Sequence, residues 1–156
     1  MAAVKYADLS TERIKDYVFS FDRMLAFEGD TGPYLLYAIA RIKNLLRKAT
    51  DKGVDTNAVK TAEFSLDEPT ERSMALTILR YPSMLKATGE NHEPHRLCGY
   101  LFELASLIAK FYEQCPVLKD GVDDPTRDGR MRLSMIALRV LEDGCDTLGI
   151  PTVDRM

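Results

Sequence analysis

The sequence of 156 residues contains no tryptophan, only two histidines and only three cysteines. Cys98, Cys115 and Cys145 are odd in number and far apart, so they predict neither a disulfide framework nor a zinc ligand set. We expect reduced thiols that act as ordinary core or surface residues. His92 and His95 find no cysteine at a ligand spacing, and we interpret them as packing or capping residues at a helix start. The sequence therefore predicts no metal and no cofactor in this chain.

An excess of positive charge is also missing, because the formal net charge is −3 at pH 7. A protein that binds nucleic acid mainly through charge normally has a basic domain, so any recognition of RNA would have to be local. No apolar run approaches the ~20 residues needed to cross a bilayer, and no signal-peptide pattern opens the chain. We therefore expect a soluble, cytoplasmic protein.

What the sequence does contain is a set of amphipathic helical patterns. From 33 to 49 the apolar residues recur every three or four positions, and similar patterns cover 68–81, 95–115 and 129–148. The pattern over 95–115 is apolar around so much of its circumference that it predicts the central helix. Pro82 either kinks the second helix or begins a new one. Four such helices joined by loops predict an all-α bundle.

The first 32 residues lack a continuous helical pattern. Residues 10–12, Ser-Thr-Glu, form a helix-start signal, and residues 17–21 have the alternation and aromatic content of a short strand. One strand cannot form a sheet, so we interpret this part as cut from a larger protein. Residues 28–32 form a turn-rich hinge, in which Thr31 is a candidate cap for a helix with Pro33 in its first turn.

The stretch with the most distinctive sequence is residues 27–41, FEGDTGPYLLYAIAR. It resembles the junction between the catalytic and anticodon-binding domains of arginyl-tRNA synthetases. Other stretches resemble the same family, in order and with compatible spacing. Residues 5–9 and 16–19 resemble the end of its catalytic domain. Residues 79–82, 93–97 and 111–112 resemble the middle helices of its DALR-type anticodon-binding domain, and residues 146–156 resemble its C-terminal tail. The chain departs from the family's usual residues at Asp30, Leu36 and Ile39.

This resemblance implies a helical bundle of the DALR anticodon-binding type over residues 33–156. Residues 1–32 would be a short irregular remnant of the catalytic domain followed by the hinge. The His-Ile-Gly-His-like and Lys-Met-Ser-Lys-Ser-like signatures of class I synthetases are missing from the sequence. Without them there is no adenylate site, so we expect a C-terminal fragment that is inactive by itself. The implied parent enzyme, arginine–tRNA ligase, uses ATP to join arginine to its tRNA in protein synthesis.

The candidate RNA-binding residues lie mainly on the first of the predicted bundle helices. Tyr37, Arg41, Asn44 and Lys48 recur at helical spacing on a face distinct from the apolar one. They offer an aromatic ring, a planar cation, an amide and an amine, and single-stranded RNA is read by stacking bases on aromatic rings or arginine planes. Composition alone favours a solvated charged face, and the resemblance reverses this preference.

The resemblance further implies that Tyr37, Arg41 and Arg47 contact the anticodon arm, with Tyr112 and Met156 nearby. Arg47 lies off the face of Tyr37 and Arg41, which favours a backbone contact. Tyr112 could equally be a core aromatic, and a last residue such as Met156 is often frayed.

The expected function is therefore binding of the anticodon arm of arginine tRNA. The missing catalytic domain is the other expected partner, and we expect the chain to bind neither DNA nor a membrane. The alternative is a helical protein-interaction module with no RNA role, in which the basic helix meets an acidic partner. A free-standing enzyme is disfavoured, because no phosphate-binding loop, dinucleotide fingerprint or nucleophile elbow is present.

Overall fold

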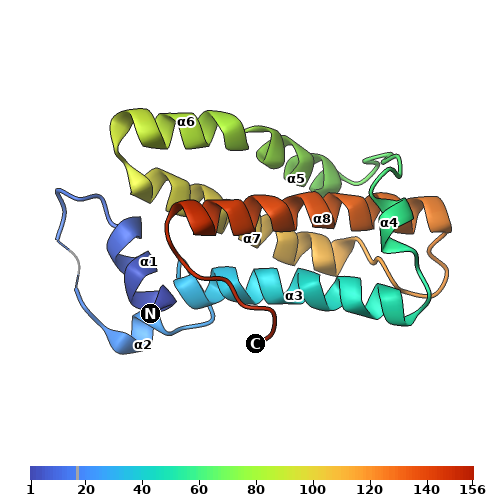
Figure 1. Cartoon of the computed structure of the whole chain (residues 1–156), viewed down its shortest axis with the longest axis horizontal. Coiled ribbons are helices and arrows are strands. Elements are labelled where there is room, and N and C mark those ends of the chain that lie inside the picture. The colour runs from blue at the N-terminus through green and yellow to red at the C-terminus, as the bar shows by residue number, and fades with distance from the viewer. Residues whose placement is uncertain (17) are drawn as a thin grey trace.

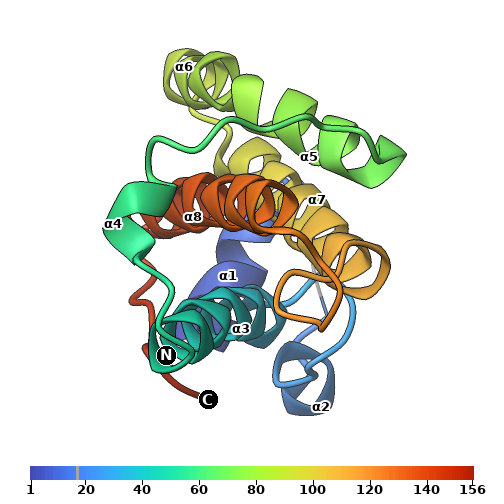
Figure 2. The same cartoon turned by 90° about the vertical axis from the view of Figure 1, so that its right-hand side faces the viewer.

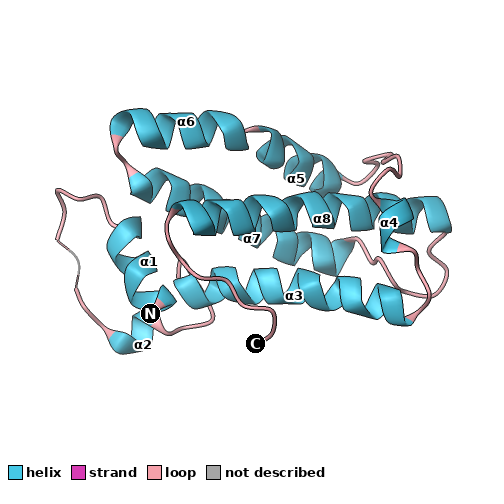
Figure 3. Cartoon of the chain, viewed as in Figure 1, coloured by secondary structure: helices cyan, strands magenta, loops and turns pink. Residues whose placement is uncertain are grey.

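The computed structural model describes residues 1–16 and 18–156, and these residues form helices and loops without any strand (Figure 3). The all-α bundle predicted from the sequence is confirmed. The eight helices in the described residues are α1 (Ala2–Ser10), α2 (Phe21–Met24), α3 (Gly32–Asp51), α4 (Thr56–Val59), α5 (Pro69–Leu79), α6 (Tyr81–Asn91), α7 (Pro94–Gln114) and α8 (Asp124–Thr147).

Three long helices, α3, α7 and α8, pack against one another along the long axis of the molecule (Figures 1 and 2). Helix α5 packs on α7 and α8, and α6 packs on α7. Helix α1 crosses the beginning of this group and contacts both α3 and α7. The side of α3 that faces away from α7 and α8 is left on the outside of the bundle.

The start and the buried face of α3 follow directly from its sequence. Thr31 Oγ1 accepts a hydrogen bond from the backbone N–H of Tyr34 at 3.2 Å, and Pro33 lies in the first turn, where its missing N–H costs nothing. Four residues of the predicted apolar stripe are buried in the core: Leu35, Ile39, Ile42 and Ala49. The fifth, Leu46, is only partly buried, and its neighbour Leu45 is buried instead. The helix predicted over 33–49 is confirmed, and the observed helix is one residue longer at its start and two residues longer at its end.

Helix α7 is the central helix, as the sequence predicts. It contributes eight buried residues to the core, more than half of them aliphatic or aromatic: Leu97, Cys98, Tyr100, Leu101, Leu104, Ala105, Ile108 and Phe111. It contacts α1, α3, α5, α6 and α8, so nearly its whole circumference is covered by protein. Such a helix must be apolar on most sides, which explains the pattern in its sequence.

The N-terminal part differs from the prediction in two places. The Ser-Thr-Glu signal at 10–12 does not start a helix, because α1 ends at Ser10 and Thr11 is already extended. The short strand predicted over 17–21 is also absent from the described residues: 18–20 form a loop, Phe21 begins α2, and Tyr17 lies outside the described residues. Residues 2–10 are thus a regular helix where irregular structure was expected.

Tyr6 explains why α1 is ordered. Its ring is fully buried, and its hydroxyl donates to Asp30 Oδ1 and contacts the carbonyl oxygen of Cys98 at 3.1 Å. At the same end of the bundle, Gly32 lies so close to α1 that a Cβ there would be 2.9 Å from the carbonyl oxygen of Ala2. Helix α1 is therefore packed tightly onto the start of α3 and onto α7.

Three helix boundaries differ from the apolar pattern or settle what it left open. Helix α8 begins five residues before the predicted start at 129, because Asp123 Oδ1 accepts a hydrogen bond from the N–H of Thr126 at 3.0 Å. Pro82 begins a new helix and does not kink the old one, since α5 ends at Leu79 and α6 starts at Tyr81. His92 ends α6 in the left-handed conformation (φ 56°) and directly precedes Glu93, the N-cap of α7, while His95 lies in the first turn of α7.

Candidate nucleic-acid interface

The outer side of α3 presents the four residues that the sequence placed on one face. Tyr37 keeps 46% of its surface exposed and Lys48 is exposed, while Arg41 and Asn44 are half-buried. They follow each other at spacings of four, three and four residues, opposite the buried stripe of the same helix. An aromatic ring and a guanidinium thus stand one turn apart at the surface.

Arg41 is held by an aromatic ring from another helix. Its guanidinium carbon lies 3.9 Å from the centroid of the Tyr112 ring, which is half-buried near the end of α7. A planar guanidinium over a tyrosine face is attractive because of the ring's negative π face. The structure therefore brings Arg41 and Tyr112 together from positions far apart in the sequence, and the Tyr112 ring supports the Arg41 guanidinium.

Tyr37 and Arg41 line a small pocket of about 100 Å³ between α3 and α7. Its floor and walls are mainly apolar, from Phe27, Tyr34, Ala38, Ala105, Ile108 and Ala109. The two surface side chains are thus placed at an apolar depression, where the flat face of a nucleobase can replace water.

A larger pocket of about 530 Å³ lies on the other side of Tyr112. Lys48 and Tyr112 line it together with Lys52, Lys119 and the apolar residues of the loop that follows α7. Lys52 and Lys119 were not among the residues predicted from the sequence, because only the fold brings the ends of α3 and α7 to one place. Three lysines, the carboxylate of Asp51 and an aromatic ring therefore line this pocket, and the Lys52 amine donates to the carbonyl oxygen of Leu118 at 3.2 Å.

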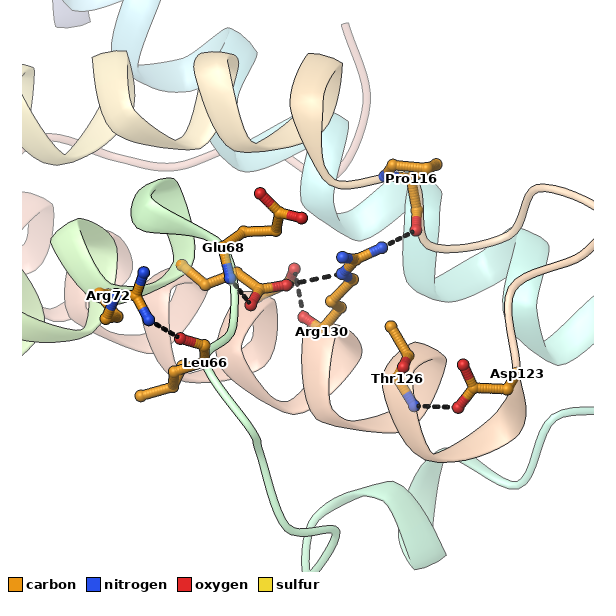
Figure 4. Close-up of polar contacts among 9 residues, drawn as sticks. Leu66, Glu68, Arg72, Pro116, Asp123, Thr126 and Arg130 are labelled. Carbon is orange, nitrogen blue, oxygen red and sulfur yellow. Dashed lines mark hydrogen bonds and ion pairs between the residues drawn. The ribbon is translucent and has the colours of Figure 1, made fainter.

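The loop that follows α7 is held in place by a buried ion pair (Figure 4). Arg130 of α8 donates from Nε to Glu71 Oε1 at 2.7 Å and from Nη1 to the carbonyl oxygen of Pro116 at 2.9 Å. The side chains of Arg130 and Glu71 are only 13% and 6% exposed. The other carboxylate oxygen of Glu71 accepts the backbone N–H of Glu68 at 3.1 Å. One buried arginine thus joins α5, α8 and the wall of the larger pocket.

Arg47 lies beside the C-terminal tail and not beside Tyr37. It donates from Nη1 to the carbonyl oxygen of Asp154 at 3.1 Å. Together with Asn44 and Lys48 it lines a third, open depression of about 600 Å³. The sequence-based separation of Arg47 from the face of Tyr37 and Arg41 agrees with this position.

The three pockets and the Arg41–Tyr112 contact join six of the seven candidate residues into one continuous surface on and around α3. In the described part of the chain, Met156 does not line any of these three pockets. It ends the tail with 57% of its surface exposed.

All three cysteines are free and buried. Burial raises the pKa of the Cys98 and Cys145 thiols to about 12 and also raises the pKa of the Cys115 thiol. Within residues 1–16 and 18–156 no group of three or more candidate ligands could hold a metal ion. None of the helices in these residues is long and apolar enough to cross a membrane.

Comparison with known proteins supports the resemblance seen in the sequence. The family model described as the DALR anticodon binding domain matches residues 35–156. The arginine–tRNA ligase of Pseudoalteromonas atlantica is 47% identical over 156 residues, which are 100% of this chain and 26% of that protein. The arginine–tRNA ligase of Synechocystis sp. is 46% identical over the same shares of the two chains.

Solved structures of similarly named proteins have the same fold. The arginyl-tRNA synthetase of Plasmodium falciparum matches with a TM-score of 0.88 at 30% identity, over 99% of this chain and 26% of that one. The Thermus thermophilus enzyme matches with a TM-score of 0.85 at 32% identity, over the same shares. The chain thus spans about a quarter of the length of the relatives it matches. With a family model matched over most of its length, the chain belongs to the DALR anticodon-binding domain family.

Proposed function

We propose that this chain binds the anticodon arm of arginine tRNA as the anticodon-binding part of an arginine–tRNA ligase. The observation that supports this most directly is the exposed Tyr37 next to Arg41, whose guanidinium is stacked on Tyr112. An exposed aromatic ring and a fixed guanidinium plane are the two surfaces on which unpaired bases stack. The names of the relatives, arginine–tRNA ligase, support arginine tRNA as the ligand.

Each candidate residue has a role that suits its position. Tyr37 and Arg41 stack on or bond to a base that enters the pocket between α3 and α7. Asn44 offers an amide to a base edge, and Lys48 and Arg47 neutralise phosphates on either side. Tyr112 keeps the Arg41 plane in position, and Met156 contributes its side chain and carboxylate at the edge of the surface.

In the whole enzyme the reaction takes place elsewhere. We propose that residues 1–32 belong to the end of the catalytic domain and that residues 33–156 hold the tRNA for it. That catalytic domain uses ATP to join arginine to the tRNA in the cytoplasm. The start of the family match at residue 35 supports this division. The alternative, a protein-interaction module, gains nothing from the comparisons.

Binding to two labelled stem-loops tests the proposal. The anticodon stem-loop of arginine tRNA and the same stem-loop with an unrelated anticodon are titrated with the 156-residue chain at several salt concentrations, with fluorescence anisotropy as the readout. We expect tighter binding of the arginine stem-loop at every salt concentration. Equal affinity for the two stem-loops throughout would refute specific recognition, because phosphate contacts alone do not distinguish anticodons.

A further inference from the structure

The C-terminal tail is tied to α3 by a set of polar contacts. Lys43 Nζ lies 2.7 Å from Asp154 Oδ1 and 3.4 Å from the carbonyl oxygen of Val153. Arg47 donates to the carbonyl oxygen of Asp154. Figure 1 shows the tail turning back from the end of α8 and running across α3. These contacts set the path of the last residues along the helix that carries the candidate RNA-binding face.

The Lys43 amine is occupied by its contacts with the tail and with α8, so it does not bind a further ligand. Its side chain is only 19% exposed, and its Nζ also lies 2.8 Å from Glu142 Oε1 of α8. The hydrogen bonds to Asp154 and Glu142 raise its pKa, and the hydrogen bond from Lys43 lowers the pKa of Asp154. The amine is therefore charged at neutral pH and neutralised by two carboxylates.

Arg155 is the residue that the tie places over α3. It is exposed, and it lines the open depression of about 600 Å³ together with Asn44, Arg47 and Lys48. Thr50 and Asp51 complete the lining. Three cations and one carboxylate thus surround a space open to solvent. Arginine has five N–H donors and no acceptor, and its planar shape suits the oxygens of a phosphate.

We propose that Arg155 binds a phosphate of the RNA backbone, and that Lys43 and Asp154 are positioning residues that hold Arg155 over α3. The inference rests on the proposed function, since the phosphate is that of the anticodon arm. Arg47 shares the depression and keeps N–H donors beyond the one given to Asp154. The tail and α3 thus form two sides of one phosphate site.

The role of Asp154 can be separated from its charge by a matched control. Asp51 lines the same depression, and Asp154 is the residue next to Arg155 in the tail. If only charge mattered, removing either carboxylate would strengthen binding of an anion, because each repels phosphate. If Asp154 positions the tail, Asp154→Ala weakens binding although it removes a negative charge, while Asp51→Ala strengthens it or leaves it unchanged.

The experiment measures the affinity of the 156-residue chain and three variants for the labelled anticodon stem-loop of arginine tRNA. We expect Arg155→Met to weaken binding about tenfold, as for the loss of a charged hydrogen bond. The same variant should reduce the slope of log K against log salt by about 0.7–0.9, the value of one phosphate contact. We expect Asp154→Ala to weaken binding about threefold, since it removes the 2.7 Å contact with Lys43 and leaves the tail held only by the two contacts to backbone carbonyls. Thermal unfolding of each variant verifies that the bundle is intact.

The outcomes keep this inference distinct from the proposed function. If the unmodified chain fails to prefer the arginine stem-loop, the proposed function is wrong. If the unmodified chain binds and Arg155→Met leaves both affinity and salt slope unchanged, Arg155 is not a phosphate ligand. If Asp154→Ala strengthens binding as Asp51→Ala does, the positioning role is refuted and only the charge of the tail matters.

Discussion

The buried pair of Arg130 and Glu71 allows a quantitative prediction. Arg130→Met removes the guanidinium and leaves the Glu71 carboxylate, 6% exposed, without its partner. Breaking a buried ion pair from one side costs about 3–5 kcal/mol, because the remaining charge stays desolvated. The carbonyl oxygen of Pro116 loses its donor as well. For a domain of this size each kcal/mol lowers Tm by about 2–4 °C, so we expect a decrease of about 6–20 °C.

A matched control lies one turn earlier on the same helix. Arg127 pairs with Asp124 and Asp128, and the side chains of these three residues are 23%, 78% and 28% exposed. Because all three are more open to water than Arg130 and Glu71, we expect a contribution near the roughly 0–1 kcal/mol of surface ion pairs, so Arg127→Met should lower Tm by only a few degrees. The assay is thermal unfolding followed by circular dichroism, with urea unfolding to obtain the free energy. A loss for Arg130→Met no larger than that for Arg127→Met would refute the reasoning.

The double variant Glu71→Leu/Arg130→Met adds a second check. Replacing both partners of a buried pair by apolar groups is often neutral, so part of the lost stability should return. The recovery is incomplete, because Glu71 also accepts the backbone N–H of Glu68 at the start of α5. A double variant less stable than Arg130→Met alone would show that the uncompensated carboxylate is not the cause of the loss.

Three further predictions concern the RNA surface and the thiols. Tyr37→Ala should weaken binding of the arginine stem-loop by about 1–3 kcal/mol, and Tyr37→Phe should weaken it by much less, because stacking needs only the ring. Equal losses of affinity for the two variants would assign the effect to the hydroxyl. Arg41→Ala should lower both affinity and salt slope if Arg41 contacts a phosphate, whereas lost anticodon preference at an unchanged slope would assign it to a base. Cys98 and Cys145, with pKa raised to about 12, should resist iodoacetamide at pH 8 until the chain is unfolded, as mass spectrometry would show; rapid labelling of the folded chain would contradict their burial.

The sequence predicted the long helices because their signals are local. In α3 the Thr31 cap, Pro33 and the apolar stripe all lie within the segment itself, so the helix could be placed before any tertiary contact was known. The face of Tyr37 and Arg41 followed from the same periodicity. The pairing of Arg41 with Tyr112 did not, since it depends on how α3 and α7 pack.

The unexpected order of α1 and the position of Arg155 depend on distant contacts. Helix α1 carries no side-chain cap, and its order depends on burial of Tyr6 against α7 and the start of α3. Arg155 lies in the tail that resembles the family, but the sequence did not indicate which side chains it would meet. Its place beside Arg47 depends on Lys43 and Asp154, which are more than a hundred residues apart in the chain.

The packing of Tyr6 also affects where the chain can be truncated in an experiment. The family match starts at residue 35, and all seven candidate RNA contacts lie after it. A chain trimmed to that point would keep every proposed contact and lose the buried Tyr6 ring, together with its hydrogen bond to Asp30 at the entrance to α3. The match to the family model thus leaves out α1, α2 and the Thr31 cap of α3, although α1 packs against α3 and α7.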